Sequence, residues 1–360
     1  MKFYMPVKVY DEPDCVENHK NELSAFGKKA LIVTGKYSAF SNGSFDDAAK
    51  ALKHNNIEFE IFSDVEENPS VETVFAAKET FSSENIDFVI GIGGGSAMDA
   101  SKAIALTLAH PDYTPADLYD TSKNSSALPV ICIPTTCGTG SEVTGVSVLT
   151  RHDKKTKISM VHKVFPSYAM VDGKYLKSAP LSLICNSAID SLSHMYESLL
   201  NTKTDDYVRM TATAGLKMWS EIKDCLTGNR DIQDNDRTYL MRSSTLAGMS
   251  IAQSGTTLPH ALSYALTYDL GIAHGPAVGY FLPGFLSAAP EKDRDEILHL
   301  SGFSDIYDFC GYIKKVLGNT DVPENELKRA YETVKNNPSK MHSASFDVDD
   351  SLLHSIVFFS

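Results

Sequence analysis

Short apolar runs alternate with helix-forming stretches through the first 134 residues of the chain, and this alternation constrains the fold more than any other feature. The apolar runs and the spacing between them predict strands over 28–35, 56–64, 86–92 and 128–134, and helices over 71–84 and 97–109. Strands that alternate with helices in this way form a parallel sheet whose faces the helices cover.

The second half of the chain has a different pattern. From about residue 180, strand signals are few and apolar positions recur with helical spacing over 183–201, 205–226, 236–255 and 324–337. We therefore predict an α/β domain over 1–178 and an all-α domain over 179–360, with the cleft between them as the natural ligand site.

The composition narrows the partners and the compartment. Apolar residues make up 42% of the 360 residues, and the net charge of −13 without a basic run argues against nucleic acid and anionic membranes as partners. No apolar stretch approaches the roughly 20 residues of a membrane helix, and the first residues show no signal-peptide core. Six scattered cysteines without a CxxC pair are typical of free thiols, so we predict a cytoplasmic protein.

The stretch GIGGGSAMDASKAIA, residues 91–105, joins the third predicted strand to a helix. Glycine lets the backbone approach a ligand, and the first turn of a helix presents N–H groups to an anion, so this loop suits a phosphate. Ser96 and Asp99 also have the spacing of a capping box, so a tight turn before a capped helix is the alternative. The two readings are compatible, and we expect Ser96 to cap the helix whose N-terminus holds the phosphate. The stretch matches neither the G-x-G-x-x-G dinucleotide pattern nor a P-loop, and alone it is a weak signal.

A second polar loop, PTTCGTGSEVTG at residues 134–145, follows the fourth predicted strand. It contains five serine or threonine hydroxyls and three glycines. Two such loops at strand ends favour a ligand whose diphosphate and sugar lie across the carboxyl edge of the sheet, and a polar surface loop is the simpler alternative.

The helical half contains one carboxylate and three imidazoles that suit a divalent metal. Asp190 and His194 are four residues apart, which places them on one face of a helix, and His260 and His274 follow later. A carboxylate on an apolar helix face needs a partner. One oxygen and three nitrogen ligands favour Fe²⁺ or Zn²⁺ over Ca²⁺ or Mg²⁺. For each histidine alone, a role without a metal is the commoner alternative.

Six motifs, in order along the chain, resemble those of the iron-containing (group III) alcohol dehydrogenases, which have the dehydroquinate synthase-like fold. The motifs are GGGSAMDASK (93–102), PTTCGTGSEVT (134–144), VDGKYL (171–176), AIDSLSHMYES (188–198), AGMSIAQSGTTLPHAL (247–262) and HGPAVGYFLP (274–283). The resemblance covers nearly the whole chain. It implies a Rossmann-like nucleotide-binding domain, a helical metal-binding domain, and a homodimer or higher homo-oligomer.

The resemblance also implies roles for individual residues. Four residues would ligate the metal, with Fe²⁺ expected and Zn²⁺ as the alternative: Asp190, His194, His260 and His274. The cofactor diphosphate would be held by Gly94, Gly95 and Ser96, with Asp99 either at the ligand or in the helix cap. The nicotinamide side would be lined by Thr135, Thr136 and Ser141, and Lys157 would reach the ribose. The metal would act as a Lewis acid on the alcohol or carbonyl oxygen while hydride passes to or from the nicotinamide.

Three positions depart from the common family pattern. Tyr264, four residues after His260, stands where many members have a second histidine that is associated with proton transfer. A tyrosine can form a hydrogen bond, but an ordinary one does not titrate near neutrality. We therefore take Tyr264 and His274 as the candidate catalytic residues. Ile251 replaces a phenylalanine that often walls the substrate pocket, and Ala188 replaces a glycine.

The choice between NAD(H) and NADP(H) is predicted from VTGKYSAF, residues 33–40. Relatives that prefer NAD often have an aspartate at the tip of this strand, whereas here the tip is Gly35, followed by Lys36 and Ser38. Without the acid there is less repulsion of a ribose 2′-phosphate, and Lys36 can pair with it. We therefore predict a preference for NADP(H) over NAD(H). The alternative is that Lys36 is a solvated surface charge.

These features together predict a metal-dependent alcohol dehydrogenase or aldehyde reductase that acts on a small primary alcohol, a diol or the corresponding aldehyde. A polyol dehydrogenase or a maleylacetate-type reductase on the same scaffold is the alternative enzyme. A nucleotide-binding relative without catalysis is the non-enzymatic alternative, and the intact set of four metal ligands weighs against it.

Overall fold

The computed structural model describes residues 3–359 and divides the chain into two compact units. The sheet unit consists of residues 5–136 and 140–179. The helical unit consists of residues 3–4, 137–139 and 180–359. Three residues of the second polar loop, 137–139, therefore belong to the helical unit, although the chain on both sides of them belongs to the sheet unit.

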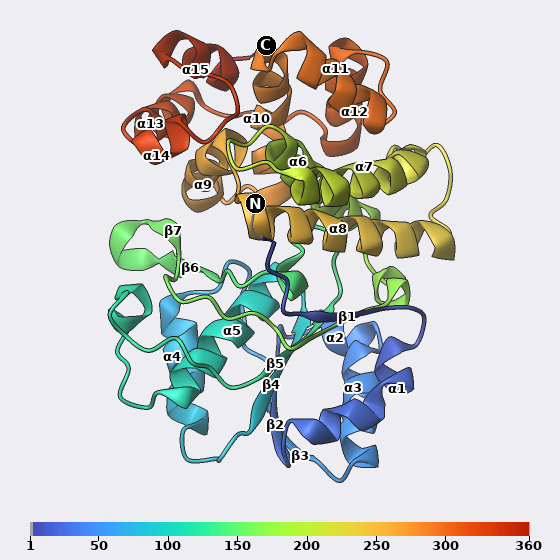
Figure 1. The fold of residues 1–360 in the computed structure, drawn as a ribbon, viewed down its shortest axis with the longest axis vertical. Helices are drawn as coiled ribbons and strands as arrows, with labels where there is room; N and C mark the ends of the chain where they lie inside the picture. The colour runs from blue at the N-terminus through green and yellow to red at the C-terminus, as the bar shows by residue number, and fades with distance from the viewer. Residues whose placement is uncertain (1–2, 360) are drawn as a thin grey trace. The chain divides into compact units, whose positions relative to one another are not determined.

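The sheet unit is built on a parallel sheet of six strands (Figure 1). Their order across the sheet is β1 (Lys8–Asp11), β8 (Tyr168–Val171), β5 (Val130–Pro134), β4 (Phe88–Gly93), β2 (Lys29–Thr34) and β3 (Glu58–Phe62). The central strands are apolar throughout and buried, as strands covered on both faces must be. The predicted α/β fold of this half is confirmed.

Alternate residues of each strand face opposite sides of the sheet, and each side has its own core. Four helices cover the sides: α1 (Cys15–Asn18), α3 (Ser44–His54), α4 (Val71–Phe81) and α5 (Gly95–Ala109). Leu31 and Val33 of β2 pack with residues of α4 and α5. Ala30 and Ile32 pack with residues of α1 and α3 on the other side, and Figure 1 shows the two pairs of helices flanking the strands. Burial of each large apolar side chain contributes about 1.5–3 kcal/mol.

The carboxyl ends of three neighbouring strands bring the predicted cofactor loops together. Strand β4 pairs with β2 on one side and with β5 on the other. The loops that begin at Gly35, Gly94 and Thr135 therefore leave the same edge of the sheet. The backbone N–H of Thr135 donates to the carbonyl of Gly93 at 2.9 Å, which joins the two polar loops directly.

Some short strands escaped prediction. The edge strand β1 and its neighbour β8 have four residues each. A two-stranded antiparallel sheet, β6 (Val148–Arg151) with β7 (Thr156–Ser159), follows the second polar loop. Four residues are too few for an alternating pattern to stand out from the surrounding chain.

The helical unit contains the predicted helices. Its helices are α6 (Leu181–Leu199), α7 (Asp206–Leu226), α8 (Asp234–Ser254), α9 (Leu258–Leu270), α10 (His274–Ala288), α11 (Glu291–Leu300), α12 (Ile306–Leu317), α13 (Glu324–Lys335), α14 (Pro338–Met341) and α15 (Asp350–Val357). Helix α6 packs against α7, α8, α10 and α12, so almost all of its length is buried. Polar side chains on this helix therefore need hydrogen-bond partners from neighbouring helices or loops.

Two further findings concern the cysteines and the possibility of a membrane span. All six cysteines are free thiols. No helix within residues 3–359 is both long and apolar enough to cross a bilayer.

Candidate metal and cofactor sites

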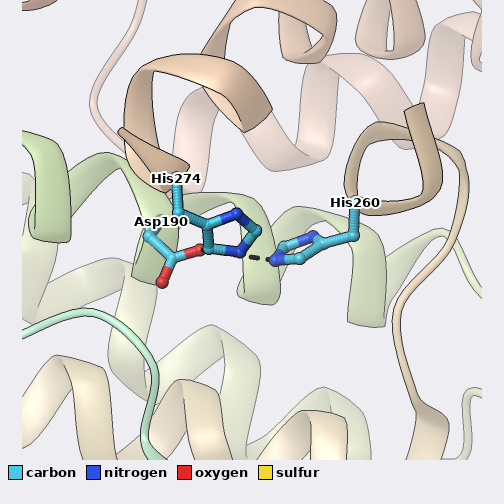
Figure 2. Close-up of side chains that lie close together, drawn as sticks. All are labelled: Asp190, His260 and His274. Atoms are coloured by element: carbon cyan, nitrogen blue, oxygen red, sulfur yellow. Dashed lines mark ion pairs between the residues drawn. The ribbon is translucent and has the colours of Figure 1, made fainter. Parts of the chain in front are cut away.

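Three imidazoles from three helices converge on one carboxylate oxygen of Asp190. Asp190 and His194 are one turn apart on α6, His260 is on α9, and His274 is the first residue of α10. Oδ1 of Asp190 lies 3.3 Å from Nε2 of His260, 3.7 Å from Nε2 of His274 and 3.8 Å from Nε2 of His194. Figure 2 shows Asp190, His260 and His274 turned toward one another. The structure thus brings together all four residues that the sequence singled out as metal ligands.

The chemistry of this cluster suits a divalent metal. Oδ1 of Asp190 and Nε2 of His260 are buried and have no hydrogen-bond partner among the described residues. Leaving one buried polar atom unsatisfied costs about 1–3 kcal/mol. One ligand atom each from Asp190, His260 and His274 lies within 4.8 Å of the others, which is close enough for a single ion to contact all three. Imidazole nitrogens with one carboxylate oxygen are the donors that Fe²⁺ and Zn²⁺ accept readily.

Two of the imidazoles are oriented by acceptors behind them. Nδ1 of His194 lies 3.2 Å from the carbonyl oxygen of Gly138. Nδ1 of His260 forms a short hydrogen bond with Oε1 of Glu197. When Nδ1 carries the proton, the lone pair of Nε2 is free to face Asp190, as a metal ligand requires. Glu197 was not predicted from the sequence. Like Asp190, it is a carboxylate on an apolar helix, and the same argument would have implied that it needs a partner.

Burial and charge act in opposite directions on these groups. Burial lowers the pKa of the His194 imidazole. Burial also disfavours the charged form of His260, but the carboxylates of Glu197 and Asp190 outweigh it and raise the pKa of His260 to about 9. Burial alone would raise the pKa of Asp190, yet the surrounding imidazoles hold it well below its usual range. The cluster therefore contains ionised carboxylates that attract a cation.

Close packing of α10 on α6 determines where His274 lies. A Cβ atom on Gly275 would lie only 1.9 Å from the carbonyl oxygen of Asn186 on α6. No side chain can be accommodated there without moving one helix away from the other. Gly275 therefore allows the first turn of α10 to approach α6, and with it His274 to approach Asp190.

The predicted catalytic Tyr264 lies beside the cluster. It is half-buried on α9, one turn after His260. Its ring stacks on that of His274, with 6.3 Å between the ring centroids and 25° between the planes. The structure thus brings the two candidate catalytic residues together, and their roles stay predictions.

The prediction that Ser96 caps helix α5 is wrong. The helix begins at Gly95, two residues earlier than predicted, and its N-cap is Gly94, whose extended backbone has φ −79° and ψ −170°. A capping side chain has to precede the first helical turn, whereas Ser96 lies within it. Its Oγ instead accepts a hydrogen bond from the backbone N–H of Asn68 at 3.0 Å. The N-cap has no side chain that could compete with an anion for the first-turn N–H groups.

Asp99 joins α5 to the second polar loop. Its Oδ1 accepts a hydrogen bond from Oγ of Ser141 at 2.6 Å, and its Oδ2 accepts one from the backbone N–H of Val148 at 2.8 Å. Ser141 also accepts a hydrogen bond at 2.6 Å from Nζ of Lys102, which is completely buried. Asp99 therefore does not complete a helix cap, and contact of Asp99 or Ser141 with a cofactor stays a prediction.

The remaining cofactor candidates lie close to Asn68, which the sequence did not single out. Asn68 has a left-handed backbone, with φ 56°. Its carbonyl accepts from Oγ1 of Thr150 at 2.7 Å, and its Oδ1 accepts from Nζ of Lys157 at 3.1 Å. One residue thus ties the start of α5 to the β6–β7 hairpin that carries Lys157.

The two polar loops are also in close contact at this edge of the sheet, because a Cβ on Gly94 would lie 3.1 Å from Oγ1 of Thr136.

The candidates for cofactor preference lie in the loop after β2. Lys36 follows Gly35, and Ser38 is the first residue of α2 (Ser38–Ser41). Nζ of Lys36 lies 3.5 Å from Oδ1 of Asp64, and both side chains are exposed. Asp64 follows strand β3 and belongs to none of the motifs recognised in the sequence. Its carboxylate competes with any phosphate for the charge of Lys36.

Two family models match the chain. The model described as iron-containing alcohol dehydrogenase matches residues 6–173, and the model described as Fe-containing alcohol dehydrogenase family, C-terminal, matches residues 184–303. A crystal structure of an iron-containing alcohol dehydrogenase from Thermotoga maritima is 36% identical and has a TM-score of 0.90, and the match covers 99% of this chain and 98% of that one.

The chain is also similar to proteins named as butanol dehydrogenases and as an aldehyde-alcohol dehydrogenase. The NADPH-dependent butanol dehydrogenase of Clostridium saccharobutylicum is 29% identical over 79% of this chain and 72% of its own length. The NADH-dependent butanol dehydrogenase A of Clostridium acetobutylicum is 27% identical over 93% of this chain and 84% of its own. Aldehyde-alcohol dehydrogenase 2 of Entamoeba histolytica is 31% identical over 81% of this chain, which spans only 34% of that longer protein.

Proposed function

Because this chain belongs to the iron-containing alcohol dehydrogenase family, we propose that it transfers hydride between NADP(H) and a small primary alcohol, a diol or the corresponding aldehyde. The family resemblance predicted from the motifs is confirmed, whereas the substrate and the preference for NADP(H) are proposals. The observation that carries the proposed function is the convergence of three imidazoles on Oδ1 of Asp190.

In the proposed reaction the residues of the site would hold the metal, bind the cofactor and contact the substrate. Four residues would hold the metal: Asp190, His194, His260 and His274. The metal supplies Lewis-acid polarisation of the substrate oxygen when bound, and the nicotinamide supplies or accepts hydride. The first-turn N–H groups of α5 would bind the cofactor diphosphate, and Lys157, held by Asn68, would reach the ribose. Tyr264 would hold a hydrogen bond at the substrate oxygen beside His274.

The direct test is turnover with a defined metal. Protein prepared without oxygen and loaded with Fe²⁺ or Zn²⁺ is expected to oxidise NADPH in the presence of short-chain aldehydes. The rates over a panel of aldehydes, diols and polyols identify the substrate class. Absence of turnover with every metal and every carbonyl compound in the panel would contradict the proposed function.

The cofactor preference is tested at Lys36 and Asp64. Lys36→Ala is expected to lower the ratio of kcat/KM for NADPH to that for NADH about 10- to 100-fold, because a charge-assisted hydrogen bond contributes about 1.5–3 kcal/mol. Asp64→Asn is expected to raise the same ratio, since it leaves Lys36 without a competing carboxylate. Lys328→Ala, which breaks a comparable exposed pair with Glu324, is the control. A clear preference of the wild type for NADH would overturn this part of the proposal.

The role of Tyr264 is tested by removing only its hydroxyl group. Tyr264→Phe is expected to lower kcat/KM for aldehyde reduction about tenfold, the effect of one hydrogen bond to the reacting oxygen, without changing the metal content. Tyr264→His is expected to remain active and to add a titration near neutrality to the pH profile of kcat. If the phenylalanine variant keeps full activity, the hydroxyl has no part in the reaction.

A further inference from the structure

Glu197 is a completely buried carboxylate that lies behind the metal cluster. It follows Asp190 by seven residues on α6, so both face the same side of the helix. Oε1 accepts hydrogen bonds from Oγ of Ser193 at 2.8 Å and from Nδ1 of His260. Oε2 accepts hydrogen bonds at 2.6 Å and 3.0 Å from the backbone N–H and Oγ1 of Thr257. The backbone N–H of Thr257 can only donate, so Oε2 must accept there, and an ionised Glu197 accepts at all four contacts.

The peptide group between Thr256 and Thr257 connects Glu197 to a lysine. Its N–H donates to Glu197, and its carbonyl oxygen accepts a hydrogen bond at 3.1 Å from Nζ of Lys340 on α14. A cation on the carbonyl side polarises the peptide and strengthens its N–H as a donor. Lys340, one peptide group, Glu197 and His260 thus form a continuous chain of hydrogen bonds that ends at the metal cluster.

We propose that Glu197 is a positioning residue that fixes the tautomer and the ring orientation of His260, and that Lys340 supports it through the 256–257 peptide. This inference rests on the proposed function, in which Nε2 of His260 ligates the metal. The acceptor on Nδ1 keeps the proton there and leaves the lone pair of Nε2 for the ion.

Replacement of the carboxylate by an amide should reverse this arrangement. In Glu197→Gln, the side-chain oxygen has to face the backbone N–H of Thr257, because that group can only donate. The amide NH₂ is then turned toward Nδ1 of His260, which favours the tautomer with its proton on Nε2. In that tautomer Nε2 has no lone pair for a metal.

The experiment measures Zn²⁺ affinity and the histidine proton. The apoprotein competes for Zn²⁺ with a chromophoric chelator, and ¹H–¹⁵N spectra of the Zn²⁺-loaded protein locate the Nδ1–H of His260, assigned by its absence in His260→Ala. We expect Glu197→Gln to bind Zn²⁺ 10- to 100-fold more weakly, the usual effect of losing such a partner. We expect its Nδ1–H signal to lose the downfield shift of a hydrogen bond to a carboxylate, and Lys340→Met to lose affinity in the same direction but less.

The control variant is Asp236→Asn, which removes another buried carboxylate of the helical unit, one that pairs with Arg230. It is expected to bind Zn²⁺ like the wild type, and circular dichroism checks that each variant folds. If His260→Ala binds Zn²⁺ as tightly as the wild type, the proposed metal site itself is wrong. If His260→Ala loses affinity but Glu197→Gln keeps it, only the present inference is overturned. Should Glu197→Gln not fold, the wild-type spectrum decides, because the absence of a downfield Nδ1–H from His260 contradicts the inference.

Discussion

Asp190→Ala is expected to lose the metal and catalytic turnover together. Oδ1 of Asp190 is the shared neighbour of three imidazoles, and the other members of this cluster among the described residues are all histidines. Lewis-acid polarisation of a substrate oxygen contributes several kcal/mol, so kcat/KM should fall on the order of 10³-fold. The metal content by mass spectrometry and the rate of NADPH oxidation are measured on the same preparation.

Asp236→Asn separates this effect from a general loss of stability. Both variants remove a buried carboxylate from the helical unit, but Asp236 pairs with Arg230 and caps α8. Its replacement should lower the free energy of unfolding and leave the metal content unchanged. If Asp190→Ala retains full activity, a metal-dependent mechanism at this cluster is wrong.

Gly275→Ala is expected to destabilise the protein by about 3 kcal/mol and to reduce metal binding. The added Cβ would lie 1.9 Å from the carbonyl oxygen of Asn186, and a backbone atom in a packed helix cannot yield as a flexible side chain can. Relief requires the start of α10 to move away from α6, and His274 moves with it. Urea denaturation measures the free energy of unfolding, and Zn²⁺ titration measures the affinity of the site.

Gly311→Ala is the matched control for this substitution. Gly311 also lies inside a helix, α12, but a Cβ there would meet no atom of residues 3–359 within 4 Å. Alanine is favoured over glycine in a helix by about 0.8–1.0 kcal/mol, so this variant should be slightly more stable than the wild type. Equal effects of the two alanine substitutions would show that the contact with Asn186 is unimportant.

The parts of the fold that were predicted correctly have strong local signals. Strands such as β4 are uninterrupted apolar runs that end in glycine, and helices such as α6 repeat their apolar residues over five turns. The metal candidates were recognisable because Asp190 and His194 share a helix face, and the family motifs supplied His260 and His274. The structure adds that Nε2 of each of the three histidines lies within 3.8 Å of Oδ1 of Asp190.

The parts that were missed depend on contacts between distant residues. Ser96 was expected to cap its own helix, but its partner is the N–H of Asn68, 28 residues earlier. Asp64 approaches Lys36 because β3 pairs with β2, which no spacing in the sequence reveals. Glu197 is different, since its position on a buried helix already implied a partner, and only the identity of that partner, His260, required the structure.

Residues 137–139 limit how chains of this type can be recombined. They belong to the helical unit, although the chain on both sides of them belongs to the sheet unit. The carbonyl oxygen of Gly138 contacts Nδ1 of His194 and orients its ring. A chimera joined at residue 179 would inherit the imidazole from one parent and its acceptor from the other. An exchange that transfers this tripeptide together with residues 180–359 keeps both partners from the same ancestor.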